Sequence, residues 1–220
     1  MSIRNINDTN YAEYYKHVDS NFFVRVFQTF KYKFILKISK YIHKDAAIID
    51  IGCGTGKFLV NMKKLGYTNL YGMDLDDAAF RSYDTAGITF IKQSITNQCD
   101  TPIDVVFLQG VLHHIPADKL LNVADNLSKM TTHQGYLFIY DTNITSLCGT
   151  LFYRYFLRLF PKLYLESKNE LSEHLNFCEL FPKFVARLET NGFKLIKSSD
   201  WAFYKAFIFI KNSSSCNSAS

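Results

Sequence analysis

One aspartate and the three glycines close behind it are the residues of this 220-residue chain whose types and spacing could do chemistry. Asp50 ends an apolar run in the segment IIDIGCGTGKFL, and Gly52, Gly54 and Gly56 follow it. Glycines allow a backbone to adopt positive φ angles and to approach a ligand closely. A carboxylate beside such a loop attracts a cation and repels a pyrophosphate. The segment therefore predicts a binding site for a ligand that carries positive charge.

A second acid points to another part of that ligand. Asp74 ends the next apolar run, at roughly the 20-residue spacing at which an acid accepts hydrogen bonds from ribose hydroxyls. S-adenosylmethionine (SAM) carries an ammonium, a sulfonium and a ribose but no phosphate, so it suits both acids. The alternative is an ordinary turn between a strand and a helix, with Asp74 capping the next helix. We interpret the loop and the two acids as a SAM site.

Strands and helices must alternate along the chain to position these residues. Apolar runs predict strands over residues 46–51, 69–75, 88–94, 103–110 and 136–142. Amphipathic spacing and glycine stops predict helices over residues 11–42, 57–65, 77–86, 118–130 and 180–190. This order is typical of an α/β fold with a mostly parallel, doubly wound sheet, which binds ligands at the carboxyl ends of its strands. Two further runs, 193–200 and 204–212, predict an antiparallel hairpin at the sheet edge.

The chain is expected to divide into three parts. Residues 1–45 are expected to form a helical N-terminal lid, residues 46–212 the ligand-binding core, and residues 213–220 a disordered polar tail. The regular alternation breaks over residues 144–175, an aromatic and basic insertion that we expect to cover the substrate.

The composition of the chain limits the classes of protein to which it can belong. A hydrophobic fraction of 48% indicates a folded chain rather than a disordered one. We see no secretory signal and no apolar run near the 18–20 residues, roughly, that span a bilayer. Five scattered cysteines, an odd number, argue against a disulfide framework and favour a reducing, cytoplasmic location. The net charge of +5 is compatible with an anionic substrate or a membrane surface, and solubility explains it equally well.

The motifs together resemble those of the class I SAM-dependent methyltransferases, of the small-molecule type. The resemblance covers residues 46–212 and rests on IIDIGCGTGKFL, YGMDLD, IDVVFLQGVLHHIP and HLNFCELFPKFVARLETNGFKLI. It implies a Rossmann-like, seven-stranded sheet with a reversed C-terminal hairpin, SAM as cofactor and S-adenosylhomocysteine (SAH) as product. It also implies that the glycine loop approaches the methionine part, Asp74 the ribose and Gln109 the amino group.

The resemblance extends to the remaining cofactor contacts, with one departure. The family often has an acid near the adenine after the third strand, where this chain reads Gln93-Ser94-Ile95. The N-terminal YAEYY is similar to the tyrosine-rich start of related enzymes, so Tyr11 or Tyr15 is expected to close over the cofactor. The full set of expected cofactor contacts is Asp50, Gly52, Cys53, Gly54, Gly56, Asp74, Leu75, Ser94, Ile95, Gln109 and Tyr15.

Four residues are candidates for chemistry on the acceptor: His113, His114, His174 and Asp141. Transfer from a sulfonium is a displacement, so holding the acceptor in line supplies much of the rate, and a base helps a hydroxyl acceptor. The alternative is that the two adjacent histidines stabilise their own turn and that Asp141 caps the next segment. No metal site is expected, because magnesium-dependent relatives need an acid where this chain has Gln109.

The insertion has a pattern of its own. The segment LFYRYFLRLFPKLYL spaces Arg154, Arg158 and Lys162 four residues apart among aromatic residues. One interpretation is a lid helix that packs its aromatic residues on the domain. The other is a lid that contacts a hydrophobic or anionic acceptor, or that makes peripheral contact with a membrane surface.

These observations favour a methyltransferase of a small molecule, hydrophobic or aromatic, at an oxygen or nitrogen atom, acting as a monomer or homodimer. The alternatives are a methyltransferase of protein or RNA, a SAM enzyme with other chemistry, and a non-enzymatic cofactor-binding protein. No nucleic-acid partner is expected, because the chain lacks the N-P-P-Y-type motif that holds a flipped base. A Y-x-x-x-K pattern at Tyr164 and Lys168 suggests a dehydrogenase, but the glycine spacing and Asp50 oppose a pyrophosphate.

Overall fold

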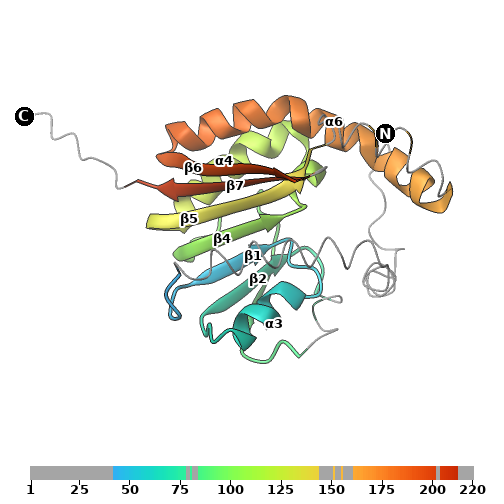
Figure 1. The fold of residues 1–220 in the computed structure, drawn as a ribbon. Coiled ribbons are helices and arrows are strands. Elements are labelled where there is room, and N and C mark those ends of the chain that lie inside the picture. The colour runs from blue at the N-terminus through green and yellow to red at the C-terminus, as the bar shows by residue number, and fades with distance from the viewer. Residues whose placement is uncertain are drawn as a thin grey trace, which may run out of the picture.

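Seven strands form one sheet in the order β3-β2-β1-β4-β5-β7-β6 (Figure 1). The computed structural model describes residues 42–77, 80, 84–143, 151, 155, 161–201 and 204–212. The strands are β1 (Ile48–Ile51), β2 (Leu70–Asp74), β3 (Thr89–Lys92), β4 (Ile103–Gln109), β5 (Thr131–Thr142), β6 (Phe193–Trp201) and β7 (Tyr204–Lys211). Strands β1 to β5 pair in parallel, and β7 runs antiparallel to both β5 and β6. The predicted fold class is confirmed, and the hairpin places β6 at the edge.

The sheet separates two hydrophobic clusters because alternate residues of its strands point to opposite faces. Helices α4 (Leu120–Met130) and α6 (Pro161–Thr190) pack on one face together with Ile49, Ile51 and Leu108. Helix α3 (Lys57–Lys64) packs on the other face with Ile48 and Phe107. Strand β1 is buried at all four positions, as expected for a central parallel strand covered on both faces. Figure 1 shows α4 and α6 on one side of the sheet and α3 on the other.

The strand order reverses direction at β1, which pairs with β2 on one side and β4 on the other. In open α/β sheets such a reversal opens a crevice beyond the carboxyl ends of the strands, where ligands bind. The predicted loop of Gly52, Gly54 and Gly56 leaves β1 at this point. The fold thus brings the loop and the ends of β2 and β4 to the same edge of the sheet.

The start of β5 differs from the prediction. The predicted helix over 118–130 ends where α4 ends, at Met130, but the strand predicted to begin at residue 136 begins at Thr131. The Thr131 hydroxyl donates to the carbonyl of Leu127 at 2.7 Å, which competes with a further helical turn. The ammonium of Lys211 donates to the carbonyls of Ser128 and Thr131. This lysine comes from β7, so contacts that hold the early start of β5 come from a distant part of the chain.

Helix α6 is also longer than expected. The sequence predicts a helix over 180–190 after an insertion at 144–175, whereas one helix runs from Pro161 to Thr190. Phe177, Phe184 and Leu188 of this helix are buried in the core cluster. Its first turns extend past the carboxyl ends of β4 and β5 in Figure 1. Residues 161–175 of the predicted insertion therefore continue a helix whose second half packs on the sheet.

Several predicted segments fall outside the described residues. These are the N-terminal helix over 11–42, except for Ile42, most of the helix over 77–86, and the tail at 213–220. The proposed domain boundaries stay predictions. No helix in the described part of the chain is long and apolar enough to cross a membrane.

Candidate functional site

The glycine loop after β1 is pressed between β2 and the segment that follows β4. The amides of Gly52 and Cys53 both donate to the carbonyl of Met73 in β2, at 2.8 and 3.1 Å. Gly52 has a φ of 69°, and a methyl group added to it would lie 2.3 Å from Cγ2 of Val111. A side chain at this position would have to displace its neighbour. The first glycine is therefore required both by backbone conformation and by space.

Asp74 at the end of β2 is bonded to the same loop. Its Oδ2 accepts a hydrogen bond from the amide of Gly54 at 2.8 Å, and its Oδ1 accepts one from the amide of Leu75 at 2.7 Å. The residue is half-buried rather than enclosed. Asp74 thus fixes the middle of the glycine loop while it stays accessible to a ligand hydroxyl.

Asp50 is joined to Gln109 across β1 and β4. The Asp50 carboxylate is 3% exposed, and its Oδ1 accepts a hydrogen bond of 2.8 Å from Nε2 of Gln109. The amide oxygen of Gln109 is buried and has no hydrogen-bond partner among the described residues. A buried acceptor without a donor is costly unless a ligand supplies one. A buried carboxylate beside an unpartnered amide oxygen fits a cationic donor such as an ammonium.

The predicted adenine side of the site lies beyond Asp74. Leu75 exposes 56% of its surface directly after the acid, an arrangement that leaves an apolar side chain for a planar base. The amide of Gln93 donates to the Asp74 carbonyl at 2.9 Å, which brings the following Ser94 and Ile95 to the same edge. The loop is held from α4, since Asn126 donates to the carbonyl of Ile95 at 2.8 Å.

Cys53 lies inside the loop and is 7% exposed. Burial raises the pKa of its thiol above the usual range, and the negative charges of Asp50 and Asp74 raise it further. A higher pKa leaves less thiolate at any given pH, so the thiol is a poor nucleophile. Its place in the loop indicates packing rather than chemistry.

Alkylation provides a direct check on Cys53. At pH 8, iodoacetamide should label Cys53 at least about tenfold more slowly than the half-buried Cys178, as peptide mass spectrometry can measure. The comparison within one chain controls for reagent and pH. Equal labelling of the two cysteines in the folded protein would show that the loop is open rather than packed.

His113 and Asp141 form a buried pair behind the site. Nδ1 of His113 lies 2.6 Å from Oδ1 of Asp141, and the two side chains are 7% and 2% exposed. Oδ2 of Asp141 accepts the backbone N–H of Leu112 at 3.0 Å. Asp141 thus anchors the 3-10 turn that follows β4 (Leu112–His114). His114 is exposed, and the centroid of its ring lies 3.9 Å from the centroid of the His113 ring.

This geometry bears on the predicted catalytic residues. The pair of His113 and Asp141 has the contacts of residues that position the loop after Gln109, and a direct role in proton transfer stays a prediction. The backbone of His174 lies in α6, but its side chain is outside the described part, as is the whole of Tyr15. Asp50, Asp74, Gln109 and the glycines are brought together at one edge of the sheet.

Sequence reasoning missed two tyrosines near this edge. Tyr140 in β5 and Tyr204 in β7 stack with ring centroids 4.9 Å apart and an angle of 17° between the rings. Both are half-buried. Burial, and then the neighbouring Tyr204, raise the pKa of the Tyr140 phenol above its usual range. The only local signal was their position at the end of one strand and the start of another.

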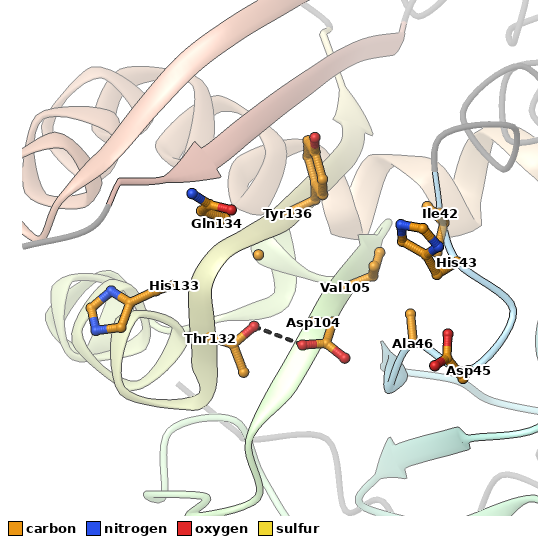
Figure 2. A pocket seen from close by; sticks show the side chains of 11 residues that line it. Ile42, His43, Asp45, Ala46, Asp104, Val105, Thr132, His133, Gln134 and Tyr136 are labelled. Carbon is orange, nitrogen blue, oxygen red and sulfur yellow. Dashed lines mark hydrogen bonds between the residues drawn. The ribbon is translucent and has the colours of Figure 1, made fainter.

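A separate cavity opens at the opposite edge of the sheet (Figure 2). Its volume is about 490 Å³, and it lies at the amino ends of β1, β4 and β5. Asp104 on its wall accepts hydrogen bonds from the hydroxyl of Thr132 and the amide of Ala47, at 2.8 and 2.9 Å. These bonds tie the starts of three strands together. The cavity contains none of the predicted site residues.

No cluster of three or more His, Cys, Asp or Glu side chains that could hold a metal ion occurs among residues that the structure describes. The acidic residues of the carboxyl edge are instead engaged with protein groups, as shown for Asp50, Asp74 and Asp141.

Solved structures of similar fold extend over most of the chain. Magnesium protoporphyrin IX methyltransferase from Synechocystis PCC 6803, with bound SAH, has a TM-score of 0.62 and 16% identity, over 91% of this chain and 94% of that chain. The N-methyltransferase NodS from Bradyrhizobium japonicum WM9, in complex with SAH, has a TM-score of 0.60 and 14% identity, over 90% and 91%. At these identities the likeness concerns the fold.

Curated relatives match a shorter region. Ribosomal protein L11 methyltransferase of Clostridium botulinum is 28% identical over 109 residues, 46% of this chain and 33% of the relative. Protein arginine N-methyltransferase 2 of Dictyostelium discoideum is 28% identical over 119 residues, 54% of this chain and 20% of the relative. The chain spans less than half the length of the curated relatives it matches.

The match to a family model is broader. A model described as "Methyltransferase domain" matches residues 23–198, a range that includes the glycine loop, both acids and the turn after β4. This confirms the resemblance that the motifs of the sequence suggested. The chain belongs to the methyltransferase-domain family.

Proposed function

We propose that the protein is a SAM-dependent methyltransferase that acts on a small molecule, hydrophobic or aromatic, at an oxygen or nitrogen atom. The main support for SAM as the cofactor is the buried Asp50 carboxylate. It is bonded to Gln109, whose amide oxygen has no partner among the described residues. Together they suit the ammonium of SAM and oppose the pyrophosphate of a dinucleotide.

The other residues at this edge suit the rest of the cofactor. The loop of Gly52, Gly54 and Gly56 would border the methionine part, because positive φ angles at all three bring bare backbone to the crevice. Asp74 would accept the ribose hydroxyls, and Leu75 would pack on the adenine. This assignment uses the acid that ends β2, the acid of β1 and the amide that ends β4.

The protein would contribute to the reaction by positioning the cofactor and the acceptor. Bound SAM supplies an electrophilic methyl group on a sulfonium. The protein's residues would hold the methionine part and exclude water, so that an acceptor atom can be aligned with the methyl group. Asp141 and His113 would set the position of the turn after Gln109 and thereby the shape of the acceptor side.

The similar proteins support two substrate classes. The structure that resembles this chain over 91% of its length is described as a magnesium protoporphyrin IX methyltransferase, which supports a small aromatic acceptor. The curated relatives are described as methyltransferases of ribosomal protein L11, of protein arginine and of EEF1A lysine, which supports a protein acceptor. We favour the small molecule because stacked tyrosines lie at the carboxyl edge.

Transfer of a labelled methyl group separates these classes. The protein is incubated with [methyl-³H]SAM and a cell lysate, and the label is followed into an ultrafiltrate and into acid-precipitated macromolecules. We expect the label in the ultrafiltrate, in a product that is distinct from SAM and that can be extracted into an organic solvent. Label confined to the precipitate would establish a protein or RNA acceptor instead. An Asp50→Ala variant serves as the control for contaminating activity.

Replacement of Asp74 tests the cofactor site without an acceptor. SAH should raise the melting temperature of the native protein and NAD should not, and Asp74→Ala should weaken SAH binding by at least about tenfold, since it removes a charged hydrogen-bonding group worth about 1.5–3 kcal/mol. The matched control is Asp45→Ala, an exposed aspartate at the opposite edge of the sheet (Figure 2). Unchanged SAH affinity in Asp74→Ala would remove the ribose assignment.

A further inference from the structure

Four side chains from four neighbouring strands form a row across one face of the sheet at its carboxyl edge. Asp50 of β1 is bonded to Gln109 of β4, Gln109 is the register partner of Tyr140 in β5, and Tyr140 stacks on Tyr204 of β7. Paired residues of neighbouring strands project to the same face. Figure 1 shows β1, β4, β5 and β7 side by side in this order. The row begins at a buried anion and ends at two aromatic rings.

The two ends of this row suit different parts of a reaction complex. If SAM binds as proposed above, its ammonium lies at Asp50 and Gln109, and its adenosine extends toward Asp74 and Leu75, over β2. An acceptor atom must come within about 3–3.5 Å of the reacting methyl carbon, in line with the bond that breaks. The β2 side is then taken by adenosine. The acceptor must approach from the other direction, toward β5 and β7.

The tyrosines offer a surface suited to one kind of acceptor. Their rings are close to parallel, at 17°, and both remain half-buried rather than enclosed. Aromatic pairs attract a further ring in offset-stacked or edge-to-face geometry with centroids about 4.5–7 Å apart. Burial also raises the pKa of the Tyr140 phenol above its usual range, which further disfavours a charged phenolate beside an apolar ring. A saturated molecule of the same size would lack this attraction.

We infer that Tyr140 and Tyr204 form the wall of the acceptor site and select a planar aromatic ring system as the substrate. This inference rests on the proposed function and adds to it the residues that hold the acceptor. Tyr140, the register neighbour of Gln109, would contact the ring next to the reacting atom, and Tyr204 would back it from β7. Neither tyrosine is a candidate for the chemical step itself.

Binding of a simple aromatic probe tests the inference without knowledge of the natural acceptor. The probe is 2-naphthol, its saturated analogue is decahydro-2-naphthol, and both are titrated by calorimetry into the SAH-loaded full-length protein. We expect 2-naphthol to bind at least about fivefold more tightly than the saturated analogue, as stacking predicts. Tyr140→Leu and Tyr204→Leu should each weaken the binding of 2-naphthol by about fivefold to tenfold. The affinity of Tyr140→Phe for 2-naphthol should stay within about twofold of the native affinity.

Tyr136 is the matched control. It lies on the same strand as Tyr140, at the other edge of the sheet on the wall of the cavity in Figure 2, so Tyr136→Leu should leave 2-naphthol binding unchanged. The inference fails if the probe does not bind, if the saturated analogue binds equally, if neither leucine variant at the stacked pair weakens binding, or if Tyr136→Leu weakens it as much. SAH affinity, measured in every variant, separates the two proposals. If the native protein binds SAH but binds 2-naphthol no more tightly than the saturated analogue, only the proposed acceptor wall is overturned. If the native protein does not bind SAH, the proposed cofactor site is overturned.

Discussion

Replacing Gly52 with alanine should abolish measurable SAH binding and lower the free energy of unfolding by about 2–5 kcal/mol. The left-handed backbone at this position, with φ of 69°, costs an alanine roughly 1–2 kcal/mol. The added methyl group would lie 2.3 Å from Val111, and relieving such overpacking typically costs about 1–3 kcal/mol more. Displacement of Val111 also moves the segment that carries Gln109. The cofactor site and the fold should therefore weaken together.

Gly66 is the matched control for Gly52. Its φ of 88° is also left-handed, but an added methyl group would meet no atom within 4 Å. Gly66→Ala should therefore show only the backbone cost of about 1–2 kcal/mol and should bind SAH with native affinity. Urea denaturation and calorimetric SAH titration measure both effects. Equal destabilisation by the two substitutions, or native SAH affinity in Gly52→Ala, would contradict the packing described for the loop.

Local sequence patterns were sufficient for the parts of the site that lie on single strands. Asp50 and Asp74 could be assigned from the apolar runs that they end, and the glycines from their spacing. Parallel strands place their carboxyl ends at one edge, which predicted that the glycine loop and the two acids would lie there, and the resemblance to the methyltransferases added Gln109. The structure agrees, with Asp50 bonded to Gln109 and Asp74 bonded to Gly54.

Contacts between distant strands could not be read in this way. The steric need for Gly52 comes from Val111, and the stack of Tyr140 on Tyr204 depends on the register between β5 and β7. Register is set by the packing of whole strands, which a single sequence does not reveal. The early start of β5 at Thr131 likewise involves a contact from Lys211, a residue of β7. What was missed is non-local, and it includes the residues that we assign to the acceptor.

The turn after β4 depends on one buried carboxylate, so Asp141→Ala should be the most destabilising substitution on the acceptor side of the site. The change leaves the amide of Leu112 and Nδ1 of His113 without the partner that each has in a buried setting. A buried donor left unsatisfied costs about 1–3 kcal/mol, so two such donors cost about 2–6 kcal/mol together. We expect a loss of that size in urea denaturation, together with weaker SAH binding because Gln109 lies just before this turn. His114→Ala is the matched control, since His114 is exposed in the same turn and should cost less than about 1 kcal/mol.

A double-mutant cycle on His113 and Asp141 decides between positioning and chemistry. If the pair holds the turn, His113→Ala and Asp141→Ala should be non-additive in stability by at least about 1 kcal/mol, as is usual for residues in direct hydrogen-bond contact. SAH affinity should then follow stability across the four proteins. If His113 also transfers a proton, His113→Ala should lower methyl transfer far more than its losses of stability and SAH affinity explain. The depth of burial of both side chains favours the first result, because a base at the acceptor must be reached by the substrate.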